Sequence, residues 1–257
     1  MSIYQHFRPE EKGFIDQVLN WKTSVETTYA PKLTDFLDPR EQEIIKQLIG
    51  INNDVKIQLF GGFEMAERKR ALLYPEYLQP EDEDFQITLY EVEYNKKFVN
   101  LEHPQVLGSL MSLGLKRIKY GDILFENERI QFLVTRDIEH YISTQLNTIG
   151  KSSVTLVKLP LDSALQSKEI WSELSVTSTS LRLDTVASAI HNISRQKSQT
   201  LIQQGLTKVN WTLIENPAFE VRESDIISIR GYGRAKIIAL EGKTKRDKWK
   251  ITAGKQK

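Results

Sequence analysis

The chain has 257 residues, enough for two or three small domains, and its 40% hydrophobic and 27% charged residues are typical of a folded globular protein. It contains no cysteine, which excludes disulfide bonds, thiolate metal sites, a cysteine nucleophile and thiol redox chemistry. The net charge of +1 hides an asymmetry, because residues 181–257 carry +8 and residues 1–180 carry −7. A basic end on an acidic body indicates a module that binds nucleic acid or another anionic surface.

The sequence over 1–80 predicts a small N-terminal α/β domain. Apolar residues over 14–25 recur at helical spacing, and the Asp-Pro-Arg-Glu sequence at 38–41 has the pattern of a capped second helix. Residues 55–60 alternate between apolar and polar as a strand does, whereas residues 64–73 are expected to be helical. Two prolines and an acidic run then predict a linker that ends this domain.

Residues 85–160 predict a second domain with the element order β-α-β-β-α-β. His103-Pro104 has the pattern of a helix start, Gly121-Asp122 is expected to form a turn, and Asn127-Glu128 is expected to be a hairpin tip. This order is that of a split βαβ, ferredoxin- or RRM-like sandwich. The strands are expected at about 85–92, 123–125, 130–134 and 154–159, and the helices at about 103–111 and 138–146.

Residues 181–240 predict a third domain of two helices and several short strands. The first helix is expected at about 184–190 with Asp184 as its cap, and the second is capped by Ser194 and ended by Gly205. The short strands are expected around Val209, Leu213, Val221 and 226–229.

This third domain resembles the S4 RNA-binding domain. The resemblance depends on Arg182-Leu183-Asp184, on Ser194-Arg195, on the helix that ends in Gly205, on Val209-Asn210 and on the run 225–230. The family usually has glycine where this chain has Trp211 and Ser224, and these departures concern the geometry of two turns. The resemblance implies that this domain has the αL-like S4 fold and binds structured RNA.

The segments beside this domain are expected to be irregular. Residues 161–180 are rich in Ser and Thr and are predicted to be a linker, part of which could dock as a strand. Residues 241–257 are predicted to be a flexible basic tail that contacts either RNA or only solvent. The expected fold class is therefore α+β, with a small α/β unit, a ferredoxin- or RRM-like domain and a C-terminal S4 domain.

The candidate RNA-binding residues are cations and amides of the third domain. A helix start offers free N–H groups to a phosphate, and arginine suits bidentate phosphate contacts and stacking on unpaired bases. For any single lysine, a solvated surface is the commoner explanation. The candidates are Arg182, Arg195, Gln196, Lys197, Gln199, Lys208, Asn210, Arg230, Arg234 and Lys236, and the secondary candidates are Arg68, Arg70, Lys116, Arg117 and Lys119.

Over its whole length the chain resembles the YlmH family of bacterial S4-domain proteins. The resemblance is carried by GGFEMAERKRALLYPEY at 61–77, LGSLMSLGLKRIKYGDILF at 107–125 and the S4 module that follows them. It implies contact with ribosomal RNA and tRNA on the large ribosomal subunit, in the rescue or quality control of stalled ribosomes. It also suggests cell-division proteins as partners. An S4 protein of cyanobacteria and plastids that is linked to photosystem II has a similar layout and remains an alternative.

Two other classes of function are alternatives to RNA binding without catalysis. The first is an RNA-modifying enzyme such as a relative of the pseudouridine synthases, which have an aspartate in a related Arg-Leu-Asp motif. Those enzymes carry the S4 domain before a large catalytic domain, so Asp184 is expected to be a helix cap. A protein-interaction factor at the division site is the third class. The four histidines, which have no metal-ligand spacing, are expected to be surface or capping residues. We therefore predict no catalytic residue, metal or cofactor.

The sequence shows no sign of a membrane segment. No stretch approaches the roughly 18 apolar residues that a membrane-spanning helix needs, and the first residues lack the apolar core of a signal peptide. The expected location is therefore the cytoplasm, with no membrane partner.

Overall fold

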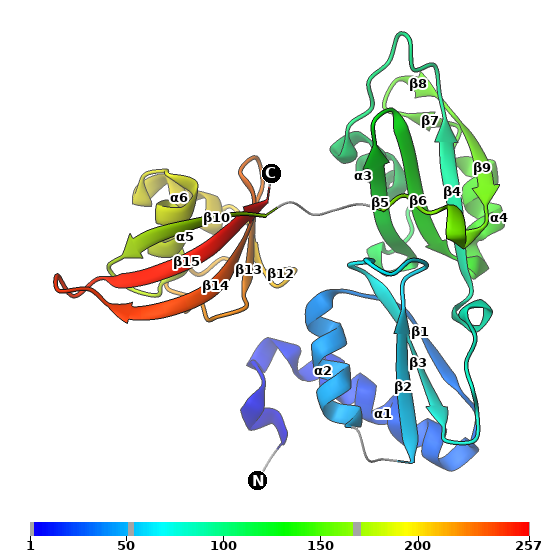
Figure 1. Cartoon of the computed structure of the whole chain (residues 1–257), viewed down its shortest axis with the longest axis horizontal. Coiled ribbons are helices and arrows are strands. Elements are labelled where there is room, and N and C mark those ends of the chain that lie inside the picture. The colour runs from blue at the N-terminus through cyan, green and yellow to red at the C-terminus, as the bar shows by residue number, and fades with distance from the viewer. Residues whose placement is uncertain (1–2, 51–53, 167–170, 257) are drawn as a thin grey trace. The chain divides into compact units, whose positions relative to one another are not determined.

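Figure 1 shows the chain as a computed structural model, which describes residues 3–50, 54–166 and 171–256. The chain divides into two compact units, residues 1–167 and 168–257, called here the N-terminal unit and the C-terminal unit. Both units combine helices with antiparallel sheets, so the predicted α+β class is confirmed. No helix in the described ranges is long and apolar enough to cross a membrane.

The N-terminal unit begins with two helices packed on a three-stranded sheet. The predicted capping of the second helix is confirmed, because the Asp38 carboxylate accepts the Glu41 N–H at 2.9 Å and the Glu41 carboxylate accepts the Asp38 N–H at 2.9 Å. The apolar sides of both helices pack on the sheet around Ile15, Ile45 and Leu73, which are almost fully buried. The elements are α1 (Lys12–Thr28), β1 (Lys32–Leu37), α2 (Pro39–Ile49), β2 (Val55–Phe60) and β3 (Lys69–Pro75), with the sheet order β1-β3-β2.

The helix predicted over 64–73 is wrong, because this stretch contains most of β3, the central strand of the sheet. Ala71, Leu72 and Leu73 are buried in succession, since β3 is covered on both faces. A short run of consecutive apolar residues has no clear period, so it fits a helix as well as a buried strand. The strand β1, which pairs with β3, was not predicted from the sequence.

The second part of the N-terminal unit has the predicted order β-α-β-β-α-β. All neighbouring strands are antiparallel, and the hairpin tip at Asn127 has φ of 53°. The turn predicted at Gly121-Asp122 is wrong, because both residues lie within β5 at an irregularity of its pairing with β6. The elements are β4 (Ile87–Glu93), α3 (His103–Ser112), β5 (Tyr120–Glu126), β6 (Arg129–Thr135), α4 (Glu139–Gln145) and β9 (Thr155–Leu159), with the sheet order β5-β6-β4-β9 and a small hairpin, β7 (Thr148–Ile149) and β8 (Ser152–Ser153).

Both faces of this four-stranded sheet are covered. The helices α3 and α4 pack on one face, where Val106, Phe132 and Ile142 are fully buried. On the other face, Leu89 and Leu133 pack in one cluster with side chains of the preceding three-stranded sheet and with the segment around 161–165. Burial on both sides explains why β4 does not alternate regularly between apolar and polar residues.

The C-terminal unit is a six-stranded antiparallel sheet with two helices on one face (Figure 1). Both predicted helices are confirmed. After the second helix, the Gly205 N–H donates to the Ile202 carbonyl oxygen and the Leu206 N–H donates to the Leu201 carbonyl oxygen, both at 3.0 Å, and this pair of hydrogen bonds forms a Schellman motif. The elements are β10 (Trp171–Ser178), α5 (Leu183–His191), α6 (Arg195–Gln203), β11 (Thr207–Val209), β12 (Thr212–Leu213), β13 (Ile226–Ile229), β14 (Gly233–Lys243) and β15 (Trp249–Gln256), with the sheet order β10-β15-β14-β13-β11-β12.

The expected linker and the expected tail pair with each other. β10 and β15 are in register from the pair Trp171 and Gln256 to the pair Ser178 and Trp249. The prediction of a flexible tail over 241–257 is therefore wrong for the strand β15, where Ile251 and Ala253 are fully buried and alternate with less buried residues. The many lysines of residues 241–257 concealed this alternation, because they dominate the composition of the segment.

Candidate nucleic-acid interface

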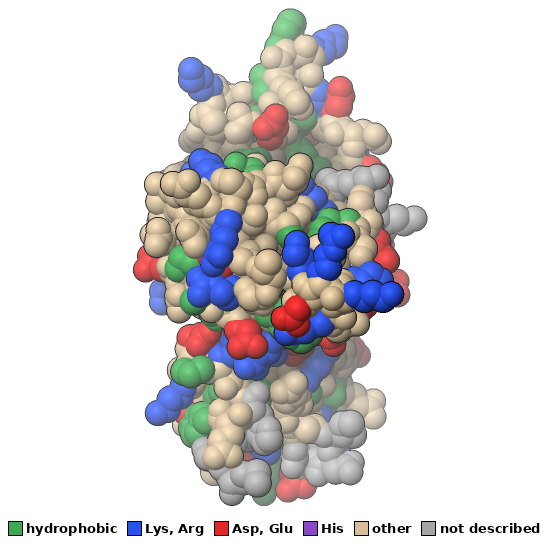
Figure 2. All heavy atoms as spheres, turned by 90° about the vertical axis from the view of Figure 1, so that its left-hand side faces the viewer, with side chains coloured by type: hydrophobic (Ala, Val, Ile, Leu, Met, Phe, Trp, Pro, Cys, Tyr) green, Lys and Arg blue, Asp and Glu red, His purple; other side chains and the backbone are tan. Residues whose placement is uncertain are grey.

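The predicted RNA-binding residues of the C-terminal unit lie on two sides of its sheet. The cross-strand neighbours Val209, Ile227 and Ala235 are buried against α5 and α6. At the adjacent register position, Lys208, Ser228 and Arg234 are cross-strand neighbours, and their side chains point to the opposite face. In Figure 2, several Lys and Arg side chains lie on the face of this unit that is turned to the viewer. The helix-side cluster consists of Arg182, Asp184, Arg195 and Gln199, and the sheet-side cluster consists of Lys208, Trp211, Arg234 and Lys236.

Asp184 is the centre of the helix-side cluster. Its carboxylate is completely buried and accepts hydrogen bonds from Arg182 Nε at 3.0 Å, Arg195 Nε at 3.0 Å and Gln199 Nε2 at 2.7 Å. Burial by itself would raise the pKa of this carboxyl group, but the hydrogen bonds from Arg182, Gln199 and Arg195 lower it to about 2. The prediction that Asp184 caps the helix is wrong, because the N-cap of α5 is Arg182.

This arrangement fixes two guanidinium groups on one side of the unit. The side chains of Arg182 and Arg195 are 39% and 54% exposed, although both bond the buried carboxylate. A guanidinium group has five N–H donors, so each arginine retains donors for a phosphate. Arg195 is also the first residue of α6, and Ser194 caps this helix by accepting the Lys197 N–H at 3.1 Å. The helix dipole adds partial positive charge at the same end.

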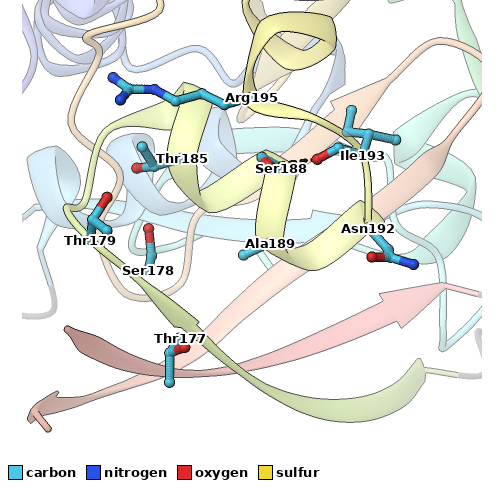
Figure 3. A pocket seen from close by; sticks show the side chains of 9 residues that line it. All are labelled: Thr177, Ser178, Thr179, Thr185, Ser188, Ala189, Asn192, Ile193 and Arg195. Carbon is cyan, nitrogen blue, oxygen red and sulfur yellow. Dashed lines mark hydrogen bonds between the residues drawn. The ribbon is translucent and has the colours of Figure 1, made fainter. Parts of the chain in front are cut away.

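A shallow hollow beside Arg195 is lined in part by side chains that carry hydroxyl groups (Figure 3). Its walls come from the end of β10, from α5 and from the turn before α6, and they include Thr177, Thr179 and Asn192. Ser188 Oγ donates to the carbonyl oxygen of Ile193 at 2.6 Å, which fixes this hydroxyl. Hydroxyl and amide groups beside a guanidinium can bond phosphate and ribose oxygens. Sequence reasoning missed this hollow, for which the Ser- and Thr-rich run before the S4 motif was the signal.

The sheet-side cluster follows directly from strand register. Lys208 and Arg234 are both cross-strand partners of Ser228, so the two cations lie on the same face of the sheet. Lys236 is two residues from Arg234 on β14 and is exposed. The guanidinium carbon of Arg234 lies 6.0 Å from the centroid of the Trp211 ring, a cation–π contact.

The remaining candidates of this unit have different surroundings. Asn210 is a structural residue, since its side chain donates to Asp225 Oδ1 at 2.7 Å and accepts the Ile226 N–H at 2.9 Å, so we drop it from the interface. Gln196 and Lys197 are exposed in the first turn of α6, and Arg230 is exposed in the turn after β13.

The secondary candidates Arg68 and Arg70 are internal. Arg68 is 6% exposed, and Arg70 is 7% exposed and donates to the carbonyl oxygens of Thr34, Phe85 and Gln86 at 2.7 to 2.8 Å. Burial lowers the pKa of Arg70. Neither guanidinium is accessible to RNA, so we drop both from the candidate interface.

The other three secondary candidates differ among themselves. Arg117 donates to the carbonyl oxygens of Tyr120 and Gly121, and Lys119 Nζ forms ion pairs at 2.8 Å with Asp35 and Asp137. These contacts hold both cations against the protein. Lys116 is exposed before this turn and stays a candidate.

The two long motifs at 61–77 and 107–125 contact each other inside the N-terminal unit. The Asp122 carboxylate accepts the N–H groups of Glu67 at 2.6 Å and Arg68 at 3.0 Å, and burial raises its pKa to about 6. A side chain on Gly121 would come within 2.9 Å of the Phe36 ring, so glycine permits the close approach. The motifs therefore join the two sheets.

His191 is buried, so the expectation that every histidine is a surface or capping residue is wrong for it. Its imidazole is 6% exposed and meets the Tyr232 ring edge-on, with 6.2 Å between the ring centroids. Burial, helped by the charge of Lys255, lowers its pKa to about 4. Within the described residues, no group of three or more His, Asp or Glu side chains could hold a metal ion.

This burial predicts that the C-terminal unit loses stability in mild acid. Below pH 6.5 the unfolded chain binds a proton at His191 that the folded unit does not bind until about pH 4, so the unfolded state is favoured. We expect the free energy of unfolding to fall by about 2 kcal/mol between pH 7.5 and pH 5 from this group. Urea unfolding at the two pH values measures it.

The matched variants are His191→Phe and His140→Phe, because His140 is exposed. His191→Phe should lose most of this pH dependence, and His140→Phe should keep it. Equal pH dependence in all three proteins would contradict the role of His191.

Comparisons with known proteins find relatives along the whole chain. Three family models match: "YlmH, N-terminal" over residues 10–78, "Putative RNA-binding domain in YlmH" over residues 80–163 and the S4 domain over residues 181–227. A curated relative, the "Ribosome-associated protein quality control protein P2" of Bacillus subtilis, is 48% identical over 257 residues, which are 100% of this chain and 99% of the relative. The solved structure of the "Cell division protein ylmH from Streptococcus pneumoniae" is 36% identical and matches with a TM-score of 0.56 over 64% of this chain and 100% of that chain.

Proposed function

The chain belongs to the YlmH family of S4-domain proteins, and from this premise we propose that it binds ribosomal RNA and tRNA on the large ribosomal subunit. Its role would be ribosome-associated protein quality control, as the name of the Bacillus subtilis relative suggests. Our proposal is that this role concerns stalled ribosomes in the cytoplasm. The observation that carries the proposal is the helix-side cluster, in which a buried carboxylate holds Arg182 and Arg195 at the surface.

The proposed mechanism is binding without catalysis. Both oxygens of Asp184 accept hydrogen bonds from cations or an amide, and its pKa of about 2 keeps it ionised at neutral pH. A carboxylate so occupied suits the positioning of arginines better than proton transfer, which needs a pKa near the working pH. Phosphate contacts made by the two arginines would fix the orientation of the S4 domain on the RNA.

The covered sheet of the RRM-like domain favours the C-terminal unit as the main RNA contact. Proteins of RRM type stack bases on aromatic residues of an open sheet face. Here Leu89 and Leu133 of that face are buried in the cluster shared with the preceding sheet. Contacts of this domain with RNA would therefore involve its helices or loops, such as the loop that contains the exposed Lys116.

The direct test is sedimentation of the protein with purified large ribosomal subunits. Arg195→Glu should weaken binding about tenfold or more, because it replaces a phosphate contact with repulsion. Wild-type binding should fall steeply with added salt, and the slope should become smaller by about one unit in the variant, since one phosphate contact is lost.

Lys46→Glu is the matched control, because Lys46 is an exposed cation on α2 in the other unit and the change in charge is the same. It should sediment like the wild type. Equal loss in both variants, or wild-type binding that salt does not weaken, would refute the assignment of the helix-side cluster to RNA.

A role through division proteins is the second candidate, favoured by the name of the Streptococcus pneumoniae relative. Affinity purification with and without nuclease separates the two cases. Division proteins that stay bound after nuclease treatment would support a direct protein contact, and their loss would assign them to RNA-mediated association.

A further inference from the structure

Trp211 occupies a backbone position that favours glycine. β11 and β12 pair through Val209 and Thr212, so Asn210 and Trp211 are the two central residues of the hairpin turn. Both have positive φ, 48° and 65°, which is the conformation of a type I′ turn. An asparagine tolerates this region, but a bulky residue there is strained. The turn therefore has type I′ geometry although a tryptophan occupies its strained position.

Packing does not account for this residue. Among the residues that the structure describes, Trp249 and Tyr232 pack against the hydrophobic core of the C-terminal unit, and Trp211 does not belong to that cluster. Trp211 is partly exposed, and the guanidinium carbon of Arg234 lies 6.0 Å from the centroid of its ring. A strained, partly exposed aromatic residue outside the core indicates a functional contact.

The surroundings of Trp211 show what that contact could be. The ring belongs to the sheet-side cluster, in which Lys208 and Arg234 lie on one face of the sheet because both are cross-strand partners of Ser228. An aromatic ring next to cations is the combination that binds single-stranded nucleic acid, since the ring stacks on a base and the cations contact the neighbouring phosphates. In a duplex the bases are already stacked and paired, so this surface would favour an unpaired nucleotide.

We propose that Trp211 stacks on an unpaired base of the bound RNA, with Lys208 and Arg234 on the flanking phosphates. This inference rests on the proposed RNA-binding function and specifies part of its substrate: a loop, a bulge or a single-stranded end. The helix-side and sheet-side clusters then contact different parts of one RNA.

The test compares the full-length wild type with Trp211→Gly and Trp211→Phe. Two RNA probes of equal charge are used, a hairpin with an unpaired loop and a blunt duplex, together with purified large ribosomal subunits. Trp211→Gly should bind the hairpin about fivefold or more weakly, because base stacking on an aromatic residue is lost, while binding to the duplex stays within about twofold. Trp211→Phe should bind the hairpin more tightly than Trp211→Gly does.

Thermal unfolding separates binding from folding in the same variants. Trp211→Gly relieves the strained φ, so its unfolding temperature should equal or exceed that of the wild type while its affinity for the hairpin falls. A purely structural role for Trp211 predicts the reverse, lower stability with unchanged affinity. In addition, the hairpin should quench tryptophan fluorescence more strongly in the wild type than in Trp211→Phe.

The outcomes distinguish this inference from the proposed function. If the wild type binds subunits and Arg195→Glu weakens that binding, but Trp211→Gly binds the hairpin as well as the wild type does, only the stacking role of Trp211 is overturned. Wild-type binding that does not distinguish hairpin from duplex also overturns it. If the wild type binds neither the subunits nor either RNA, the proposed function fails as well.

Discussion

Asp184→Asn is expected to weaken binding to large ribosomal subunits about tenfold or more, even though it makes the protein more positive. The amide keeps the size of the side chain but cannot accept from Arg182, Arg195 and Gln199 at once. The two arginines then lose the common anion that orients them. If the total charge alone determined binding, the same substitution would tighten it, so the direction of the change distinguishes orientation from charge.

The same substitution should destabilise the C-terminal unit by about 2 kcal/mol at neutral pH. The pKa of Asp184, about 2, lies below its usual value of 3.8, so the ionised carboxylate stabilises the folded state above about pH 4. This contribution decreases as the pH falls toward 2. The difference in free energy of unfolding between wild type and Asp184→Asn should therefore shrink between pH 7 and pH 3 in urea titrations.

Asp247→Asn is the matched control for both measurements. Asp247 is an exposed carboxylate in the turn between β14 and β15, where its φ is 56°, a value that asparagine tolerates well. Asp247→Asn removes one negative charge, as Asp184→Asn does. It should change the affinity for large subunits by less than about twofold and the free energy of unfolding by less than about 0.5 kcal/mol. If both variants bind subunits more tightly than the wild type, the orienting role of Asp184 is contradicted.

Arg70→Met is expected to lower the free energy of unfolding of the N-terminal unit by about 3 to 5 kcal/mol. Methionine fills most of the space of the buried stem but leaves the carbonyl oxygens of Thr34, Phe85 and Gln86 without the donors that the guanidinium supplies. These carbonyls belong to both halves of the unit, so the substitution should loosen the contact between its sheets. Chemical denaturation, followed by circular dichroism, measures the loss.

Lys69→Met is the matched control on the same strand, because Lys69 is only partly buried and its ammonium makes one long contact, 3.4 Å to the Glu64 carbonyl. It should cost less than about 1 kcal/mol. Should Arg70→Met prove as stable as Lys69→Met and yet bind RNA more weakly, Arg70 would return to the RNA interface.

Local signals in the sequence predicted several elements well. The capped helix α2, the βαββαβ order and the two helices of the C-terminal unit depend on capping residues, turn residues and periodicity, which act over a few residues. The strand β3 was missed because tertiary contacts bury it on both faces and remove the alternation. The pairing of β10 with β15 was also missed, because it joins segments that are far apart in the sequence.

The candidate site was likewise predicted in part from the sequence. The S4 motif predicted which cations cluster around α5 and α6, and the structure brings Arg182, Arg195 and Gln199 together on Asp184. Composition could not show that Arg68 and Arg70 are internal, because a buried arginine and a solvated one look alike in a charged stretch. The departure at Trp211 was visible in the sequence, but its meaning required the backbone angles of the turn.

The pairing of β10 with β15 also has a consequence for the order of folding. Helices α5 and α6 and the hairpin of β11 and β12 form through contacts close in sequence, whereas β10 and β15 are separated by nearly all of the C-terminal unit. Pairs with large sequence separation form late, since closing a long loop costs chain entropy before the contacts compensate for it. Until β15 is in place, β10 has no strand to pair with. The C-terminal unit therefore completes its six-stranded sheet only after β15 has formed, and β10 is the strand that joins it last.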